Sequence, residues 1–164
     1  MTTTQELQLS KRPVAETGML IRRPVAEVFA AFVDPEITAR FWFSKGSGRL
    51  VPGARVTWEW EFYGVSTQVE VKAIDENERI LIDWDVDSAP TTVEWRFTPH
   101  GDDATFVAIV NSGLHGDGDA VVAAALDSTG GFTWVLAGAK AWLEHGLALN
   151  LVPDRHPDAR VDRS

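Results

Sequence analysis

The chain has 164 residues, no cysteine and a formal net charge of −9 at pH 7. This length fits one domain with a substantial core. Without cysteine there can be no disulfide, thiolate metal site or cysteine nucleophile, and such sequences are typical of reducing compartments. The negative charge opposes binding to polyanions, because nucleic-acid-binding proteins usually carry a basic patch. We therefore expect no nucleic-acid partner.

The two ends of the chain differ in composition from its middle. Residues 1–16 are polar and aperiodic, and the closing "PDRHPDARVDRS" places two prolines among charges. We therefore predict flexible tails at 1–16 and 151–164 around one domain at 17–150. The N-terminus has no apolar run of signal-peptide length, and nowhere do about 18 apolar residues follow one another. These features predict a cytoplasmic protein that does not enter a membrane.

The domain opens with a pattern typical of a strand followed by two short helices. Residues 19–21 are apolar, and Pro24 then suits the first turn of a helix. Apolar residues recur at three- and four-residue steps from Val25 to Phe32, which predicts an amphipathic helix. Asp34 and the proline after it predict the cap and first turn of a second helix that ends near Arg40.

A period of two predicts an antiparallel meander in the middle of the chain. Alternating apolar residues occupy five segments: 56–62, 65–71, 80–86, 91–97 and 104–112. A helical pattern begins at Asp117, is interrupted at Gly130 and Gly131, and ends near Gly146. Small residues around Gly138 would let this helix lie close to the sheet. The elements together predict an α+β domain.

Two segments carry a resemblance to a known family. The stretch "RPVAEVFAAFVDPEITARFW" resembles the early strand-helix-helix signature of the branch of the START-like (SRPBCC) superfamily named for the activator of the heat-shock-protein ATPase. The stretch "GGFTWVLAGAKAWLEHG" resembles the terminal helix of that branch. The resemblance spans about residues 18–150 and implies the helix-grip fold, in which a curved antiparallel sheet wraps around a long C-terminal helix.

The same resemblance implies a cavity between the concave face of the sheet and the last helix, which the superfamily uses for lipids, polyketides and other apolar ligands. It carries over no catalytic residues. Eukaryotic activators have an additional N-terminal domain for chaperone docking, and 164 residues leave no room for it. We therefore do not expect chaperone activation from this chain.

Seven tryptophans and eight phenylalanines are more than a small core normally requires. Those on the apolar phases of the strands should face one interior, where they either fill a sealed core or line a cavity. Indole N–H groups need partners, which favours a cavity wall. The candidate ligand-binding residues are Trp42, Phe43, Trp58, Trp60, Trp84, Trp95, His115, Phe132 and Leu136.

The acidic residues of the strands alternate with these aromatics, so we predict that they point to solvent. They include the pair Glu59 and Glu61, which an outward position excludes from acid/base catalysis. Asp83, Asp85, Asp87 and Glu94 follow a calcium-loop spacing, but Ser88 stands where that loop needs glycine and both flanks have the strand period. We interpret them as hairpin acids on the outward phase.

Further motifs for metals or cofactors are missing from the sequence. The four histidines form no HExxH pair or metal-site spacing, and "SKGSG" lacks the spacing of a phosphate-binding loop. His115 lies in the loop before the last helix, where it is either a surface residue or a polar contact in the cavity. We predict no metal, no cofactor and no catalytic residue.

Three functions remain open at this stage. The first is the binding of an apolar or aromatic small molecule. The second is an enzyme of the cyclase or dehydratase type, for which Arg40 or His115 would transfer protons. The third is a module that interacts with a chaperone or a regulator in a stress response, which would need an exposed apolar patch. The sequence leaves the oligomeric state open, a homodimer included.

Overall fold

The computed structural model describes residues 6–162 of the chain. Seven strands form one antiparallel sheet in the order β1-β7-β6-β5-β4-β3-β2. The strands are β1 (Ala15–Ile21), β2 (Lys45–Gly46), β3 (Arg55–Trp60), β4 (Val65–Asp75), β5 (Arg79–Trp84), β6 (Thr91–Pro99) and β7 (Thr105–Ser112). The helices are α1 (Val25–Val33), α2 (Pro35–Thr38), α3 (Gly118–His145) and α4 (Leu151–Arg155), with 3₁₀ turns at Glu61–Tyr63 and Pro157–Ala159.

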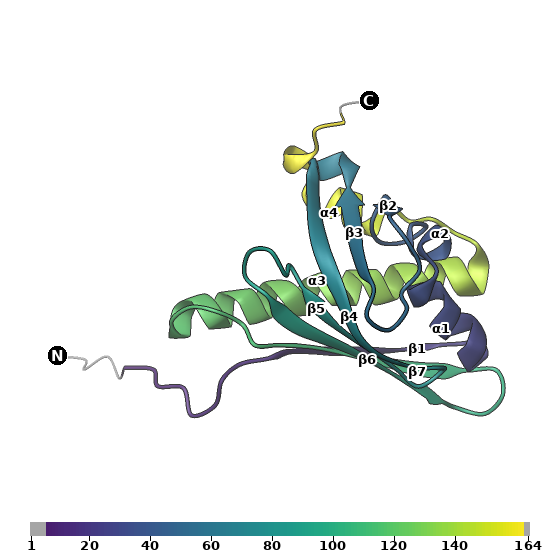
Figure 1. Ribbon diagram of the computed structural model, residues 1–164, viewed down its shortest axis with the longest axis horizontal. Coiled ribbons are helices and arrows are strands. Elements are labelled where there is room, and N and C mark those ends of the chain that lie inside the picture. Colours follow the sequence, from purple (N-terminus) through teal and green to yellow (C-terminus); the bar gives the residue numbers. More distant parts are fainter. Residues whose placement is uncertain (1–5, 163–164) are drawn as a thin grey trace.

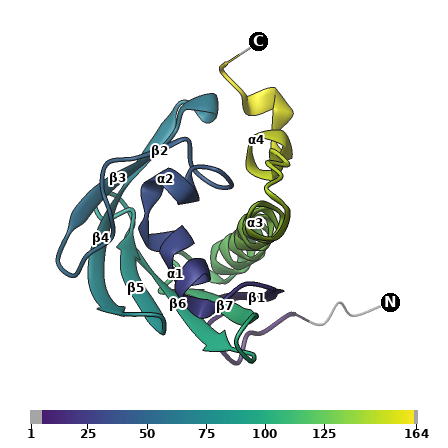
Figure 2. The ribbon, with the colours of Figure 1, turned by 90° about the vertical axis from the view of Figure 1, so that its right-hand side faces the viewer.

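The sheet curves around the long helix α3, as the predicted helix-grip fold requires (Figure 1). Seen along α3, the strands form an arc on one side of it, α1 and α2 lie inside the arc, and α4 lies near the hairpin of β3 and β4 (Figure 2). α3 packs most extensively along β1 and also contacts β7. The α+β fold class and the two short helices after the first strand are confirmed.

The register of the strands places the aromatic phase inside the arc. Trp58 pairs with Thr67, and both are buried, whereas Glu59 is half-buried and Glu61 is exposed. The inward phase predicted for 56–62, 80–86 and 91–97 is therefore confirmed within β3, β5 and β6, because a slip of one residue would have reversed it. The strands in the first two of these segments are shorter than predicted, since the chain leaves the sheet in a 3₁₀ turn after Trp60 and β5 ends at Trp84.

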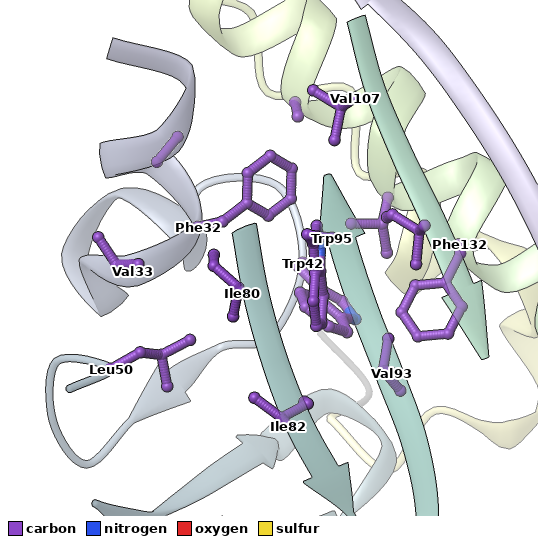
Figure 3. Close-up of a cluster of buried hydrophobic side chains, with 14 of the residues drawn as sticks. Phe32, Val33, Trp42, Leu50, Ile80, Ile82, Val93, Trp95, Val107 and Phe132 are labelled. Carbon is purple, nitrogen blue, oxygen red and sulfur yellow. The ribbon is translucent and has the colours of Figure 1, made fainter. Parts of the chain in front are cut away.

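The two short helices cover one end of the concave face. α1 begins after Pro24 and α2 after Asp34, whose carboxylate accepts a hydrogen bond from the Glu36 backbone N–H (3.0 Å). α1 directs Phe29 and Phe32 against Phe97, with ring centroids 5.3 and 6.0 Å apart. These rings belong to one hydrophobic core, which fills this end of the arc with side chains. Figure 3 shows Phe32 among other members of this core.

The helix α3 runs without a break for 28 residues, and the expected interruption at Gly130 and Gly131 is wrong. It ends at Gly146 in the left-handed conformation (φ 66°), as predicted. Its length and composition would allow it to cross a membrane, and 28% of its most apolar window is buried inside the fold. Val135, Leu136 and Ala139 are buried in the fold, as in the core helix of a soluble domain.

The chain after residue 150 differs from the expected tail without regular structure. It forms α4 and a 3₁₀ turn that lie against the turn between β3 and β4. The Tyr63 hydroxyl donates to the Val152 carbonyl (2.5 Å) and accepts from the His156 backbone N–H (3.2 Å), and the Val161 N–H donates to the Phe62 carbonyl (2.9 Å). Strand β2, within the glycine-rich stretch "SKGSG", was not predicted either, and it pairs with β3.

Glu144 ties the end of α3 to the end of β1. Its side chain is 10% exposed and accepts hydrogen bonds from the Arg22 N–H (3.0 Å) and from Lys140 (2.6 Å). Burial acts to raise the pKa of Glu144, but these two donors outweigh it, so the pKa lies below its ordinary value. The pKa of Glu144 is lower in the folded protein than in the unfolded chain, where it is about 4.3. Glu144 therefore stabilises the fold fully at pH values above about 4.3, and this stabilisation is lost as the pH falls through the pKa of the folded protein.

We expect Glu144→Gln to lower the free energy of unfolding by about 1–2 kcal/mol at pH 7, since charged hydrogen bonds are lost. Urea unfolding at pH 7 and pH 3 measures this, and the difference from wild type should shrink at pH 3. Glu27→Gln is the control, because Glu27 makes only an exposed ion pair with Arg23 (3.8 Å). Equal effects of the two variants at pH 7 would contradict the assignment.

The close approach of α3 at Gly138 is to the segment after α2 and not, as expected, to the sheet. A Cβ at this position would be 3.2 Å from the Phe41 carbonyl oxygen and 3.2 Å from the Phe41 Cβ. Gly138→Leu should therefore lower the free energy of unfolding by about 1–3 kcal/mol through overpacking. Ala123→Leu, on the exposed side of the same helix, is the control. A urea midpoint of Gly138→Leu equal to that of the control would refute this contact.

Candidate functional site

A cavity of about 440 Å³ lies at the end of the arc that α1 and α2 leave uncovered. It is bounded by the ends of β3, β5 and β7, the start of β6, the first half of α3 and the segment around α4. This volume falls in the range of small-molecule sites. The lining residues are Trp42, Trp60, Tyr63, Trp84, Asp85, Ala89, Thr91, Asn111, Leu114, Ala124, Asp127, Ser128, Gly131, Phe132, Trp134, Val135, Val152, Arg155 and His156.

Three indoles and one phenyl ring pack together in the apolar wall, and the more exposed Trp134 of α3 is a fourth tryptophan that lines the cavity. Trp42 stacks on Trp84 with an angle of 19° between the rings and 5.7 Å between their centroids. Trp60 lies 5.7 Å from Trp84 and 6.2 Å from Trp42, and Phe132 of α3 meets Trp42 edge-on at 5.8 Å. The rings pack against one another, so each supports the position of its neighbours in the wall.

The polar side of the cavity is centred on Asn111, which is buried at the end of β7. Its amide nitrogen donates to Thr91 Oγ1 (3.0 Å) and to the Thr92 carbonyl (2.9 Å). Its amide oxygen accepts from Ser128 Oγ of α3 (2.8 Å). This network satisfies the buried amide and fixes the distance between the sheet and the helix beside the cavity.

Asp85 lines the cavity, although the alternation of the strand predicts that it points to solvent. It follows β5 with a positive φ of 58°, a conformation that aspartate tolerates better than most residues. The left-handed residue breaks the alternation of the strand, so Trp84 and Asp85 both line the cavity. The Asp85 carboxylate accepts one long hydrogen bond from Thr67 Oγ1 (3.5 Å). The predicted outward position of Asp85 is therefore wrong.

The other acids of that series do point outward, as predicted. Asp83 pairs with Lys72 (3.3 Å), Asp87 pairs with Arg55, and Glu94 accepts from Arg79 (2.8 Å). Burial acts to raise the pKa of Glu94. The Arg79 and Arg96 guanidinium groups act to lower it and have the larger effect, so the pKa of Glu94 is below its ordinary value. Within residues 6–162, no cluster of three or more metal-ligating side chains occurs.

The C-terminal segment 151–156 forms the outer rim of the cavity. Arg155 forms an ion pair with Asp127 of α3 (3.2 Å). Its guanidinium lies against Gly130 and Gly131, where an added Cβ would be 3.1 Å from a guanidinium nitrogen in each case. The two glycines thus give the arginine room on the helix surface. Val152, Arg155 and His156 complete the rim.

The predicted site residues fall into two groups. Trp42, Trp60, Trp84 and Phe132 line the cavity. Phe43, Trp58, Trp95 and Leu136 are buried in the core behind them and do not line it. Trp58 stacks on Phe43 (5.1 Å between centroids), and Trp95 lies about equally far from Trp42 and Phe132 (6.1 Å each; Figure 3). The aromatic set therefore serves both as cavity wall and as core.

The two polar candidates lie outside the cavity. His115 is exposed, and its Nε2 donates to the Pro90 carbonyl (2.7 Å), while the neighbouring Leu114 lines the cavity instead. Arg40 lies over the Trp142 ring, 5.3 Å from its centroid. Neither is placed to transfer a proton to a molecule in the cavity.

Sequence reasoning missed the polar side and the rim. The inward phase of β7 did contain a signal for Asn111, because it falls on the same face as the buried Val107 and Ile109. Tyr63 and Arg155 had no such signal, since a 3₁₀ turn and the docking of α4 bring them to the cavity. Ser128 has no signal of its own in the helical pattern.

Solved structures with the same architecture exist at low sequence identity. Protein SSP2350 from Staphylococcus saprophyticus is 27% identical, with a TM-score of 0.72 over 83% of this chain and 95% of that one. The Aha1 dimer from Colwellia psychrerythraea is 18% identical, with a TM-score of 0.65 over 81% and 97%. DynU16, described as a protein of the dynemicin biosynthetic locus, is 21% identical, with a TM-score of 0.71 over 83% and 49%.

No curated protein matches the chain. A family model, in contrast, matches residues 22–138, which is more than half of the chain and includes α1, the sheet from β2 to β7 and most of α3. The match agrees with the family resemblance of the two sequence segments. The chain belongs to the family described as activator of Hsp90 ATPase homolog 1-like proteins.

Proposed function

We propose that this protein binds an apolar or aromatic small molecule in the cavity between the sheet and α3. The observation that carries the proposal is a cavity of about 440 Å³ with Trp42, Trp60, Trp84 and Phe132 in its wall. A core that needs these rings only for stability would close around them. Instead, Ala124 and Ser128 of α3 present small side chains and Gly131 has none, which leaves the space open.

The family and its structural neighbours support the same proposal. DynU16 belongs to a biosynthetic locus, which favours a small molecule over a protein partner as the ligand of this fold. We also propose that the protein acts in the cytoplasm, which the absence of cysteine supports. A homodimer is proposed by analogy with the neighbour from Colwellia psychrerythraea, and sedimentation equilibrium tests it.

The function is tested by titration with N-phenyl-1-naphthylamine, an uncharged probe that fluoresces in apolar surroundings. We expect saturable binding of one probe per chain, accompanied by quenching of the tryptophan emission. Native mass spectrometry of the same preparation shows whether a small molecule already occupies the cavity. A protein that is free of ligand by mass and binds no probe would overturn the proposal.

A further inference from the structure

Some charged side chains around the cavity form an ion pair and one does not. The aspartate, arginine and histidine residues that line the cavity are Asp85, Asp127, Arg155 and His156. Asp127 and Arg155 neutralise each other at the rim through their ion pair (3.2 Å). The carboxylate of Asp85 has no basic side chain within 4.0 Å among residues 6–162. The cavity therefore contains one negative charge that the described part of the chain does not offset.

The neighbours of Asp85 are the groups that favour a cation. Trp84 precedes it in the chain, and Trp42 and Trp60 lie 5.7 Å from Trp84. Indole rings attract a cation more strongly than the rings of phenylalanine or tyrosine, because of their larger negative potential above the ring. A carboxylate that lines the same cavity as these tryptophans can offer a cation both an ion pair and cation–π attraction. The net charge of −9 adds a long-range attraction for cations.

The backbone at Asp85 shows that this placement is specific. Asp87, two residues further on, turns outward and pairs with Arg55, whereas Asp85 adopts a positive φ of 58° that brings its carboxylate to Thr67 on the concave face. A regular strand would have sent Asp85 to solvent, where a carboxylate costs nothing to hydrate. We propose that the cavity selects organic cations, namely apolar or aromatic molecules that carry a protonated amine, with the ammonium group beside Asp85.

This inference rests on the proposed binding function, so its test uses three compounds that share one ring. These are 1-naphthylmethylamine, which is cationic, 1-naphthalenemethanol, which is neutral, and 1-naphthoic acid, which is anionic. Each is titrated calorimetrically against the full chain at pH 8, where imidazole groups carry little charge. We expect the amine to bind about tenfold more tightly than the alcohol, and the acid to bind most weakly.

The variant Asp85→Asn keeps the size of the side chain and the tolerance for positive φ. It should bring the ratio of amine to alcohol affinity close to one. Asp103→Asn is the matched control, because Asp103 is exposed in the hairpin between β6 and β7 and far from the cavity wall. It should leave the ratio as in wild type.

The outcomes separate the two proposals. If the alcohol binds to wild type but the amine binds no better, the selection of cations is wrong and the binding function stands. The same conclusion follows if Asp85→Asn keeps the preference for the amine. If none of the three compounds binds to protein that is free of ligand by mass, the binding function fails and the cation preference falls with it.

Discussion

Replacing Trp95 with alanine should lower the free energy of unfolding by about 3–5 kcal/mol, the range for removing a large buried aromatic side chain. Trp95 is 1% exposed and packs among Phe32, Trp42 and Phe132 in the core. The loss should appear as a lower urea midpoint with an unchanged dependence on denaturant. The structure places Trp95 behind the cavity wall, so we expect the stability effect to dominate over any change in probe binding.

The variant Trp95→Phe makes this prediction sharper. Among residues 6–162 the buried indole nitrogen of Trp95 has no hydrogen-bond partner, and an unpaired buried donor costs about 1–3 kcal/mol. A phenyl ring keeps much of the apolar contact and removes that donor. Trp95→Phe should therefore cost less than half as much stability as Trp95→Ala. Equal losses for the two variants, or an alanine variant as stable as wild type, would contradict the core assignment.

Filling the cavity from the helix side should abolish most of the binding. Ala124 of α3 lines the cavity, and a phenyl ring at this position would occupy the space opposite the indoles. We expect Ala124→Phe to weaken binding of N-phenyl-1-naphthylamine by at least about tenfold, which corresponds to 1.4 kcal/mol. Fluorescence titration measures the change, and urea unfolding confirms that the variant folds.

Ala123→Phe is the matched control for this experiment. Ala123 is the preceding residue on the same helix, and its side chain is exposed and does not line the cavity. The control adds the same apolar ring to the protein but leaves the cavity open, so its affinity for the probe should match wild type. Equal weakening by both variants would show that the probe binds elsewhere.

Most of the fold could be predicted because apolar residues recur every second residue in the strands and every three to four residues in the helices. Alternation placed Trp58 and Trp60 inward, and the cap at Asp34 and the glycine at Gly146 set helix ends within one or two residues. The break predicted at Gly130 did not occur, because these glycines make room for Arg155 rather than ending the helix. The role of Gly130 depends on Arg155, which lies 25 residues further along the chain and packs against it.

The candidate site was predictable only in part. The pattern identifies which aromatics face inward, but it cannot tell the wall from the core, since that depends on which end of the arc α1 covers. Trp84 and Trp95 share one phase, yet only Trp84 lines the cavity. Asp85 was missed because a single left-handed residue reverses the direction of its side chain. The alternation of apolar and polar residues in the sequence does not indicate where such a reversal occurs.

The indole N–H signals in a two-dimensional NMR spectrum test the central claim most directly, because the seven tryptophans report from different parts of the fold. During titration with N-phenyl-1-naphthylamine, the signals of Trp42, Trp60 and Trp84 should shift together and saturate at one probe per chain. The signal of Trp142, which lies outside the cavity against Arg40, should stay in place. Saturable shifts confined to Trp142, or unchanged signals of Trp42, Trp60 and Trp84, would show that the cavity is not a binding site.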